Sequence, residues 1–182
     1  MTSDNDRDLI ERFKKGDPSA FEAILLRHQD RIYNLCRYML REPRDAQDAA
    51  QDVFVKVYKA LKDFRPDSSL YTWMYRIAVS TCLDYRRKSR REAFRSLPLT
   101  EDLPSDERSP HQFRESTEIA ESIHAALQKL PEKLRAAIVL REIEGLSYEE
   151  IAEVLHTSVG TVKSRISRAR EQLRLLLKKN HG

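Results

Sequence analysis

The sequence contains few glycines and few cysteines. Among its 182 residues there are only 4 Gly and 2 Cys, whereas 34% of the residues are charged. This composition is typical of a soluble, helix-rich protein rather than a loop-rich β fold. Cys36 and Cys82 form no CxxC pair and lie in apolar stretches, which favours reduced structural thiols. The histidines lack ligand spacing as well, so we expect no metal and no other cofactor.

Long apolar runs are also missing. No stretch reaches the roughly 20 apolar residues that cross a bilayer, and the start MTSDNDRDLIERF lacks both the basic flank and the hydrophobic centre of a signal peptide. We therefore expect a cytoplasmic location without membrane insertion. A glycine-rich phosphate loop is absent from the sequence. No paired carboxylates and no nucleophile with a matching base stand out, which argues against an enzyme.

Helical spacing of apolar residues defines a first domain, expected over residues 1–92. Leu9, Ile10 and Phe13 share one stripe, and a second helix follows the break at residues 16–18. A third helix is predicted over 45–61, with Ala49, Val53, Val57 (or Phe54) and Leu61 on one face. A fourth starts near residue 70, with an inward stripe through Trp73, Ile77 and the side of Ala78 and Thr81.

A linker is predicted over residues 93–118. Apolar periodicity fails between residues 96 and 122, three prolines interrupt the chain, and the net charge of this stretch is −5. The second domain is expected over 119–182 and begins with a helix whose apolar positions are Ile119, Ile123, Ala126, Leu127 and Leu130. The predicted fold class is therefore all-α: two small helical domains joined by a flexible linker.

The stretch SYEEIAEVLHTSVGTVKSRISRAR predicts a helix-turn-helix at the end of the second domain. A preceding helix ends at Gly145, and Ser147 with Glu150 forms a capping-box pattern. Ser158 can then cap a last helix whose inward positions include Val162, Ile166 and Ala169.

The opposite face of this last helix is basic and hydroxyl-rich. From Thr157 onward, seven Lys and Arg residues against one Glu give a charge of +6, which the whole-chain charge of +4 conceals. Such a face suits a helix in the major groove, where hydroxyls and long cations reach base edges and flanking cations meet phosphates. The alternative is an ordinary solvated helix face.

Two features of the first domain point to partners. Aromatic residues alternate with cations over residues 64–88, a mixture that binds single-stranded nucleic acid by stacking and charge. The alternative is that Trp73 and at least one tyrosine belong to the core. Asp45, Asp48, Gln51 and Asp52 form a polar ridge that could bind a protein. Its acids could equally favour only the helix N-terminus through the helix dipole.

Four blocks together resemble one protein family. They are KKGDPSAFEAILLRHQDRIYNLC, DAQDAAQDVFVKVYKAL, FRPDSSLYTWMYRIAVST and LPEKLRAAIVLREIEGLSYEEIAEVLHTSVGTVKSRISRAREQL. Their combination resembles bacterial RNA polymerase sigma factors of the extracytoplasmic-function group, close to the RpoE-like branch. The resemblance covers nearly all of the chain except the linker. It implies a subunit that binds core RNA polymerase, directs initiation at specific promoters and is controlled by an anti-sigma factor.

The resemblance also implies residue roles. The first domain resembles the sigma-2 module, and its surface for core polymerase would comprise Asp45, Asp48, Gln51, Asp52 and Phe54. Recognition of the melted nontemplate strand at the −10 element would fall to Phe64, Arg65, Ser68, Tyr71, Trp73, Tyr75, Arg76, Ser80, Arg86 and Arg87. The second domain resembles the sigma-4 module, which would read the duplex −35 element with Arg141, Thr161, Lys163, Ser164, Arg165, Ser167 and Arg168.

Two departures from the family pattern lie in the strand-capture region. Relatives commonly have RGDS and IAVNT where this chain has RPDSS and IAVST, so Pro66 stiffens the loop and Ser80 replaces an Asn. Because Ser is shorter than Asn and has fewer hydrogen-bonding groups, we expect an altered or relaxed base preference at one −10 position. The competing interpretation of the chain is a stand-alone helix-turn-helix regulator, which has no use for a strand-capturing loop or a docking ridge.

Overall fold

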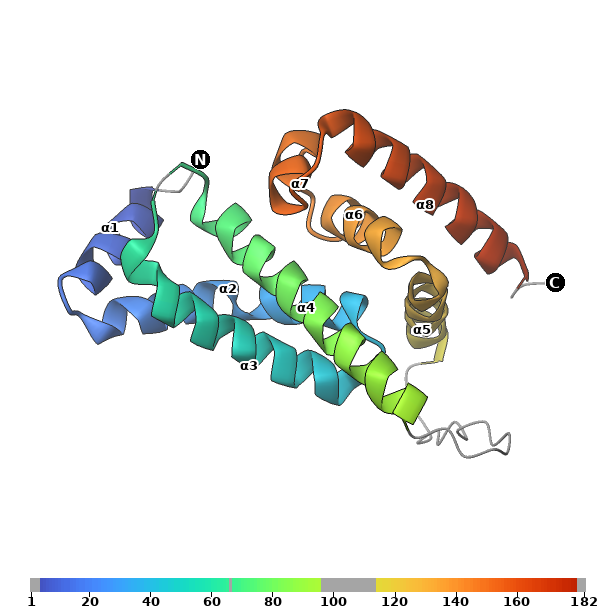
Figure 1. Ribbon diagram of the computed structural model, residues 1–182, viewed down its shortest axis with the longest axis horizontal. Coiled ribbons are helices and arrows are strands. Elements are labelled where there is room, and N and C mark those ends of the chain that lie inside the picture. Colours follow the sequence, from blue (N-terminus) through green and yellow to red (C-terminus); the bar gives the residue numbers. More distant parts are fainter. Residues whose placement is uncertain (1–3, 66, 96–113, 180–182) are drawn as a thin grey trace.

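The computed structural model describes residues 4–65, 67–95 and 114–179, and every α-helix and 3₁₀ turn in these ranges belongs to one of two modules (Figure 1). The first module comprises α1 (Asp4–Lys14), α2 (Pro18–Met39), α3 (Pro43–Ala60), a 3₁₀ turn (Leu61–Asp63) and α4 (Leu70–Arg95). The second comprises α5 (Arg114–Lys129), α6 (Glu132–Glu142), α7 (Tyr148–Val154) and α8 (Val159–Lys179). No strand occurs in the described ranges, which confirms the all-α prediction.

Local signals set the helix starts of the first module. Asp17 caps α2 by accepting a hydrogen bond from the Ser19 amide at 3.0 Å, and Pro18 occupies the first turn. Pro43 occupies the first turn of α3. The carboxylate of Asp17 also accepts from the Ser19 hydroxyl and the Arg12 guanidinium, and these bonds lower its pKa.

The core of the first module lies between α2, α3 and α4. Its buried residues include the predicted stripes of the first and third helices. Cys36 and Cys82 are buried and free, as expected. Their side chains meet across α2 and α4, and the hydrogen bond between them, together with burial, raises the pKa of Cys82. These thiols therefore act as small core residues.

The inward face of α4 agrees with the prediction only in part. Ala78 and Thr81 are buried as predicted, but Trp73 and Ile77 are only half-buried. Met74 and Cys82, which the predicted stripe does not include, are fully buried. Helix α4 is packed by α3 and α2 on one side and by α7 on another, so apolar residues occur around most of its circumference. Periodicity alone could not identify the side that faces the core. Pro66 lies outside the described residues.

The second module has its core between α6, α7 and α8. Ser147 and Glu150 form the predicted capping box, with hydrogen bonds of 2.8 and 3.1 Å. Gly145, which follows α6, has a φ of +72°, a conformation that glycine adopts without strain. On α5, however, Ile119 is 58% exposed and Ile123 is also exposed. Only Ala126, Leu127 and Leu130 of the predicted stripe are buried, because α5 meets its neighbours with its C-terminal half.

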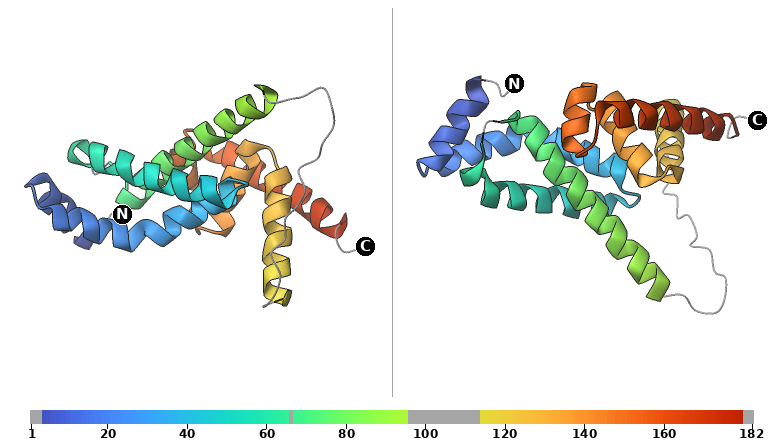
Figure 2. Two further views of the ribbon diagram at one scale, coloured as in Figure 1. Left: turned by 90° about the horizontal axis from the view of Figure 1, so that it is seen from below. Right: turned by 45° about the horizontal axis from the view of Figure 1, so that its top comes forward.

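Helix extends into both ends of the predicted linker. Helix α4 continues through Arg95 and α5 begins at Arg114, so residues 93–95 and 114–118 are helical. Residues 96–113 lie outside the described ranges. In Figures 1 and 2 the last turns of α4 project beyond the helical bundle.

The two modules are in direct contact. Helix α2 packs against α5 and α6, and α4 packs against α7 (Figure 2). The C-terminus of α2 is capped from the second module: Gln128 donates to the Leu40 carbonyl at 3.1 Å, His124 lies 3.1 Å from the same carbonyl, and Arg135 donates to that of Met39 at 3.0 Å. Carbonyls that a helix leaves unsatisfied at its end are thus paired across the module boundary.

Candidate nucleic-acid interface

Helix α8 presents the predicted −35 reading face to solvent. Ser158 caps the helix by accepting from the Thr161 amide at 3.1 Å, and Val162, Ile166 and Ala169 are buried on the inner side. The predicted reading residues include four that are exposed: Lys163, Ser164, Ser167 and Arg168. Thr161 and Arg165 are partly buried at the flanks. The exposed group has the position that a helix in the major groove requires.

Arg141 lies on α6, beside α8, and not on α8 itself. Its Nη1 donates to the Leu146 carbonyl at 2.7 Å, and its guanidinium lies over the Tyr148 ring at 4.9 Å. The Lys163 ammonium lies 5.8 Å from the same ring. These contacts fix the direction of two cations near the start of α8.

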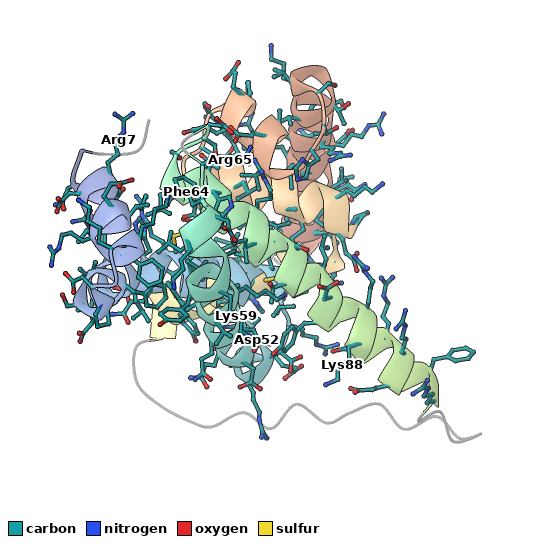
Figure 3. The ribbon with its side chains drawn as sticks, turned by 60° about the vertical axis from the view of Figure 1, so that its left-hand side comes forward. Arg7, Asp52, Lys59, Phe64, Arg65 and Lys88 are labelled. Carbon is teal, nitrogen blue, oxygen red and sulfur yellow. The ribbon has the colours of Figure 1, made fainter. Side chains whose placement is uncertain are left out.

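A pocket of about 350 Å³ lies at the predicted strand-capture loop. It is lined by residues of the end of α3, the 3₁₀ turn, the loop, the first turns of α4 and α7: Ala60, Asp63, Phe64, Arg65, Asp67, Ser68, Trp73, Arg76 and Glu153. Phe64 is only 4% exposed and packs against Trp73 with ring centroids 5.1 Å apart. Figure 3 shows Phe64 and Arg65 at the start of α4, far from Lys88 near its end. The pocket therefore has an aromatic wall and an edge of mixed charge, where Arg65 and Arg76 stand beside Asp63, Asp67 and Glu153.

Two tyrosines that were predicted to contact the DNA strand form hydrogen bonds with the second module instead. Tyr75 is fully buried, and its hydroxyl donates to the carboxylate of Glu144. Tyr71 is half-buried and donates to the same carboxylate at 3.4 Å. Burial raises the pKa of Tyr71 to about 12 and also raises those of Tyr75 and Glu144. In this arrangement both phenol hydroxyls donate to one partly buried carboxylate.

The remaining predicted −10 residues lie along α4. Ser80 is exposed and borders a pocket of about 580 Å³ together with Lys56, Arg76 and the α7 residues Val154 and Leu155. Arg76 forms an ion pair of 3.0 Å with Glu153 of α7.

Further along α4, Arg86 pairs with Glu132 at 3.1 Å, and Arg90 pairs with the same carboxylate at 3.1 Å. Arg87 is exposed and pairs only with Asp84, at 3.6 Å. The predicted strand-binding residues of α4 thus divide between two sides of the helix. Trp73, Arg76 and Ser80 line the two pockets beside α7. Tyr71, Tyr75 and Arg86 face Glu144 and Glu132 of the second module.

The predicted ridge on α3 divides between two sides of the helix. Asp45, Asp48 and Asp52 follow helical spacing toward α4, where Asp52 accepts a hydrogen bond of 2.8 Å from Tyr85. Burial and these three carboxylates raise the pKa of Tyr85. Figure 3 shows Asp52 and Lys59 on the outer part of α3.

Gln51 and Phe54 lie instead on an apolar groove of about 810 Å³ between α2 and α3. Sequence periodicity did not reveal this groove. Its other lining residues are Phe21, Leu25, Gln29, Tyr33, Gln47, Ala50, Val55, Tyr58 and Lys59. Val55 and Tyr58 are each 50% exposed on its edge. Exposed apolar residues gathered around a concave surface are typical of a protein-binding site.

Three charged residues of the interface were not predicted. Arg135 is fully buried without a carboxylate partner and donates to four backbone carbonyls and to the Gln128 side chain. Glu144 and Glu153 contact the strand-binding face of the first module. One sequence signal existed for Arg135: a lone charge at the start of the apolar run AAIVL. The two glutamates give no such signal.

Within the described ranges, no cluster of three His, Cys, Asp or Glu residues could hold a metal ion. The helices described there are also not long and apolar enough to span a membrane.

Comparisons with known proteins agree with both modules. The model of Sigma-70 region 2 matches residues 24–92, and that of Sigma-70 region 4 matches residues 120–173. The RNA polymerase sigma-H factor of Pseudomonas aeruginosa is 41% identical over 181 residues, covering 95% of this chain and 94% of that protein. The ECF RNA polymerase sigma-E factor of Haemophilus influenzae is 40% identical over 177 residues, covering 92% and 93%.

Solved structures show the same relationship. The sigma factor RpoE, in complex with the anti-sigma factor NepR from Bartonella quintana, superposes with a TM-score of 0.70 at 28% identity. The match covers 87% of this chain and 96% of that one. The similarity to these proteins therefore covers both modules, which follow one another in the same order along each chain.

Proposed function

The chain belongs to the sigma-70 family of RNA polymerase sigma factors, in its extracytoplasmic-function (ECF) group, and on this basis we propose that it is a promoter-specificity subunit. It binds core RNA polymerase in the cytoplasm, directs initiation at a specific set of promoters and performs no catalytic step itself. The observation that supports this most is the presence of both sigma regions in one chain, at residues 24–92 and 120–173. A stand-alone helix-turn-helix regulator would need only the second.

The two modules divide promoter recognition between them. Helix α8 enters the major groove at the −35 element with Lys163, Ser164, Ser167 and Arg168 at its centre. The pocket beside Trp73 accepts an extruded base of the nontemplate −10 strand. Opening a duplex costs a few kcal/mol for each unstacked step, so binding of a flipped base offsets part of that cost. This division explains why aromatic residues gather at one site and long cations at the other.

The surface of α3 is proposed to bind the core enzyme. The acidic side with Asp45, Asp48 and Asp52 supplies negative charge for contact with a basic surface of the core enzyme. The adjoining groove with Gln51 and Phe54 supplies apolar area that the same contact can bury. An anti-sigma factor is a further expected partner, by similarity to the relative whose structure contains one. Such a protein would regulate the chain by competing for these surfaces.

The test adds the purified chain to sigma-free core polymerase with fragmented genomic DNA, and the 5′ ends of the transcripts are sequenced. We expect a stable complex in size-exclusion chromatography and start sites that share upstream −35 and −10 sequences. Core polymerase alone is the control for non-specific starts. Absence of both a complex and specific start sites would contradict the proposal.

A further inference from the structure

The strand-capture pocket depends on a short segment that is held at both of its ends. Residues 64–69 connect the 3₁₀ turn to α4, and Phe64, Arg65, Asp67 and Ser68 of this segment line the pocket. Ser69 directly precedes α4, and its hydroxyl accepts a hydrogen bond from the Thr72 amide at 3.0 Å. This bond has the pattern of a helix cap, so a local signal fixes the end of the segment at α4.

The other end of the segment is held by a residue that is distant in sequence. Lys14, the last residue of α1, donates from its Nζ to the Phe64 carbonyl at 3.0 Å. A hydrogen bond from an ammonium to a carbonyl is charge-assisted and therefore stronger than one between neutral groups. The Phe64 ring packs in turn against Trp73, which lines the same pocket. The direction in which the chain enters the pocket is thus set by Lys14.

Helix α1 gives Lys14 a firm base. Leu9, Ile10 and Phe13 are buried, and the Phe13 ring lies 5.3 Å from that of Tyr58 on α3. Helix α1 also packs against α2 and against the 3₁₀ turn, as Figure 1 shows at the left-hand end of the first module. The position of Lys14 relative to the pocket is therefore determined by a packed core.

From this geometry we propose that Lys14 is a positioning residue for base capture at the −10 element: by holding the Phe64 carbonyl, it fixes the wall of the pocket that receives the extruded base. The inference rests on the proposed function, because it assumes that this pocket accepts a base of the nontemplate strand. Lys14 precedes the stretch that matches Sigma-70 region 2, residues 24–92. Helix α1 thus supports the pocket from outside that stretch.

Loss of this hydrogen bond should affect the pocket more than the fold. Lys14 is exposed, so water can bind the Phe64 carbonyl in place of the ammonium. The peptide between Phe64 and Arg65 then has more conformational freedom, and a base that enters the pocket must first order it. Ordering of a loop on binding lowers affinity. The cost therefore arises only when a base is captured.

The test compares Lys14→Met with Lys15→Met, each as a full-length chain assembled with core polymerase. Methionine keeps an unbranched side chain but has no ammonium. Lys15 is the adjacent residue and is also exposed, so its variant removes the same charge from nearly the same place. A third variant, Lys14→Arg, retains a charged donor.

The probe is a fluorescein-labelled promoter fork with a duplex −35 element and a single-stranded nontemplate −10 element, taken from the start sites mapped with the unmodified chain. In a second series of forks, an abasic site replaces one −10 nucleotide at a time. Fluorescence anisotropy gives the dissociation constant of each holoenzyme for each fork. The abasic position that weakens binding of the unmodified holoenzyme most identifies the captured base.

We expect Lys14→Met to bind the intact fork about three- to tenfold more weakly, the range that one hydrogen bond supports. On the fork that lacks the captured base, Lys14→Met should bind as the unmodified chain does, because an empty pocket needs no ordering. The two changes are then non-additive, as expected for groups that act at one site. Lys15→Met should match the unmodified chain on both forks, and Lys14→Arg should recover most of the affinity.

Three results would overturn the positioning role. An equal loss for Lys14→Met on the intact and abasic forks would place its effect outside the pocket. An equal loss in Lys14→Met and Lys15→Met would show a general attraction between positive charge and DNA. Unchanged affinity of Lys14→Met for the intact fork would show that the hydrogen bond does not shape the pocket.

The unmodified chain separates this inference from the proposed function. If its holoenzyme initiates at no specific promoter, or if no abasic position weakens its binding to the fork, the proposed function is wrong at this pocket. If it initiates and one abasic position weakens binding, any of the three results above means that only the role of Lys14 is wrong.

Discussion

At the scale of single residues, Ser80 is the position where this chain departs from the family pattern within its −10 face. Its hydroxyl is exposed at the edge of a pocket that Lys56 and Arg76 also line. Ser80→Asn adds a longer side chain with both donor and acceptor groups. We expect it to sharpen base preference at one −10 position, measured by sequencing transcripts from a randomised promoter library.

Ser89→Asn is the matched control for this change. Ser89 is exposed on the same helix but outside the pocket that contains Ser80. The variant Ser89→Asn should leave the base preference at every promoter position unchanged. An identical preference for the unmodified chain and Ser80→Asn would count against a role of Ser80 in reading the strand.

Arg168 tests the direction of the α8 reading face. It is exposed opposite the buried stripe of Val162, Ile166 and Ala169. If it forms a bidentate contact to a base, Arg168→Ala weakens binding to the preferred −35 duplex by about 1 to 3 kcal/mol and relaxes specificity at that base. Fluorescence titration with the preferred duplex and single-base variants measures both effects.

The control for this substitution is Arg174→Ala, an exposed arginine further along α8. It removes the same charge outside the predicted reading set. A loss for Arg168→Ala that is equal on every duplex would assign Arg168 to a phosphate, because phosphate contacts do not depend on sequence.

At the scale of helices, local signals predicted most of the fold. The prolines at the starts of α2 and α3, the Ser147 capping box and Gly145 act within a few residues of themselves, so the sequence determines them directly. On α4, Ala78 and Thr81 were predicted correctly as inward, whereas Trp73 and Ile77 were not, because α4 packs against α7 as well as against α2 and α3. Exposure of Ile119 and Ile123 was missed because periodicity shows which residues share a face, not what covers that face.

The same difference between local signals and long-range contacts applies to the candidate site. The −35 face lies on one helix, so a helical wheel was enough to identify its exposed residues. The −10 face depends on contacts between segments that are far apart in the sequence, such as Arg76 with Glu153 and Tyr75 with Glu144. No local pattern encodes those pairs.

Arg135 joins three helices through its guanidinium. It donates to the carbonyls of Leu127 and Leu130 near the end of α5 and to that of Met39 at the end of α2. Because Arg135→Ala leaves buried carbonyls unpaired, we expect the free energy of unfolding to fall by roughly 3 kcal/mol. Urea denaturation followed by circular dichroism measures this change.

Lys133→Ala removes the same charge from an exposed position on α6 and should change the free energy of unfolding by less than about 0.5 kcal/mol. If the two variants unfold at the same urea concentration, the hydrogen bonds of Arg135 do not stabilise the folded chain.

At the scale of the whole molecule, the two surfaces proposed to read the promoter differ in exposure. The face of α8 with Lys163 and Arg168 is exposed to solvent, whereas the side of α4 with Trp73, Arg76 and Ser80 is partly covered by α7.

The contact between the two modules should depend on salt. Among the described residues, three ion pairs cross between the modules, from Arg76 to Glu153 and from Arg86 and Arg90 to Glu132. The screening length falls from about 10 Å at 0.1 M to about 3 Å at 1 M ionic strength, which weakens partly exposed pairs. We expect the radius of gyration from small-angle X-ray scattering to increase over this range of sodium chloride. The double variant Glu132→Ala and Glu153→Ala lacks all three pairs, so its radius should be larger at low salt and change little. A radius that stays constant or falls with salt in the unmodified chain would mean that apolar contacts, rather than carboxylates, hold the modules together.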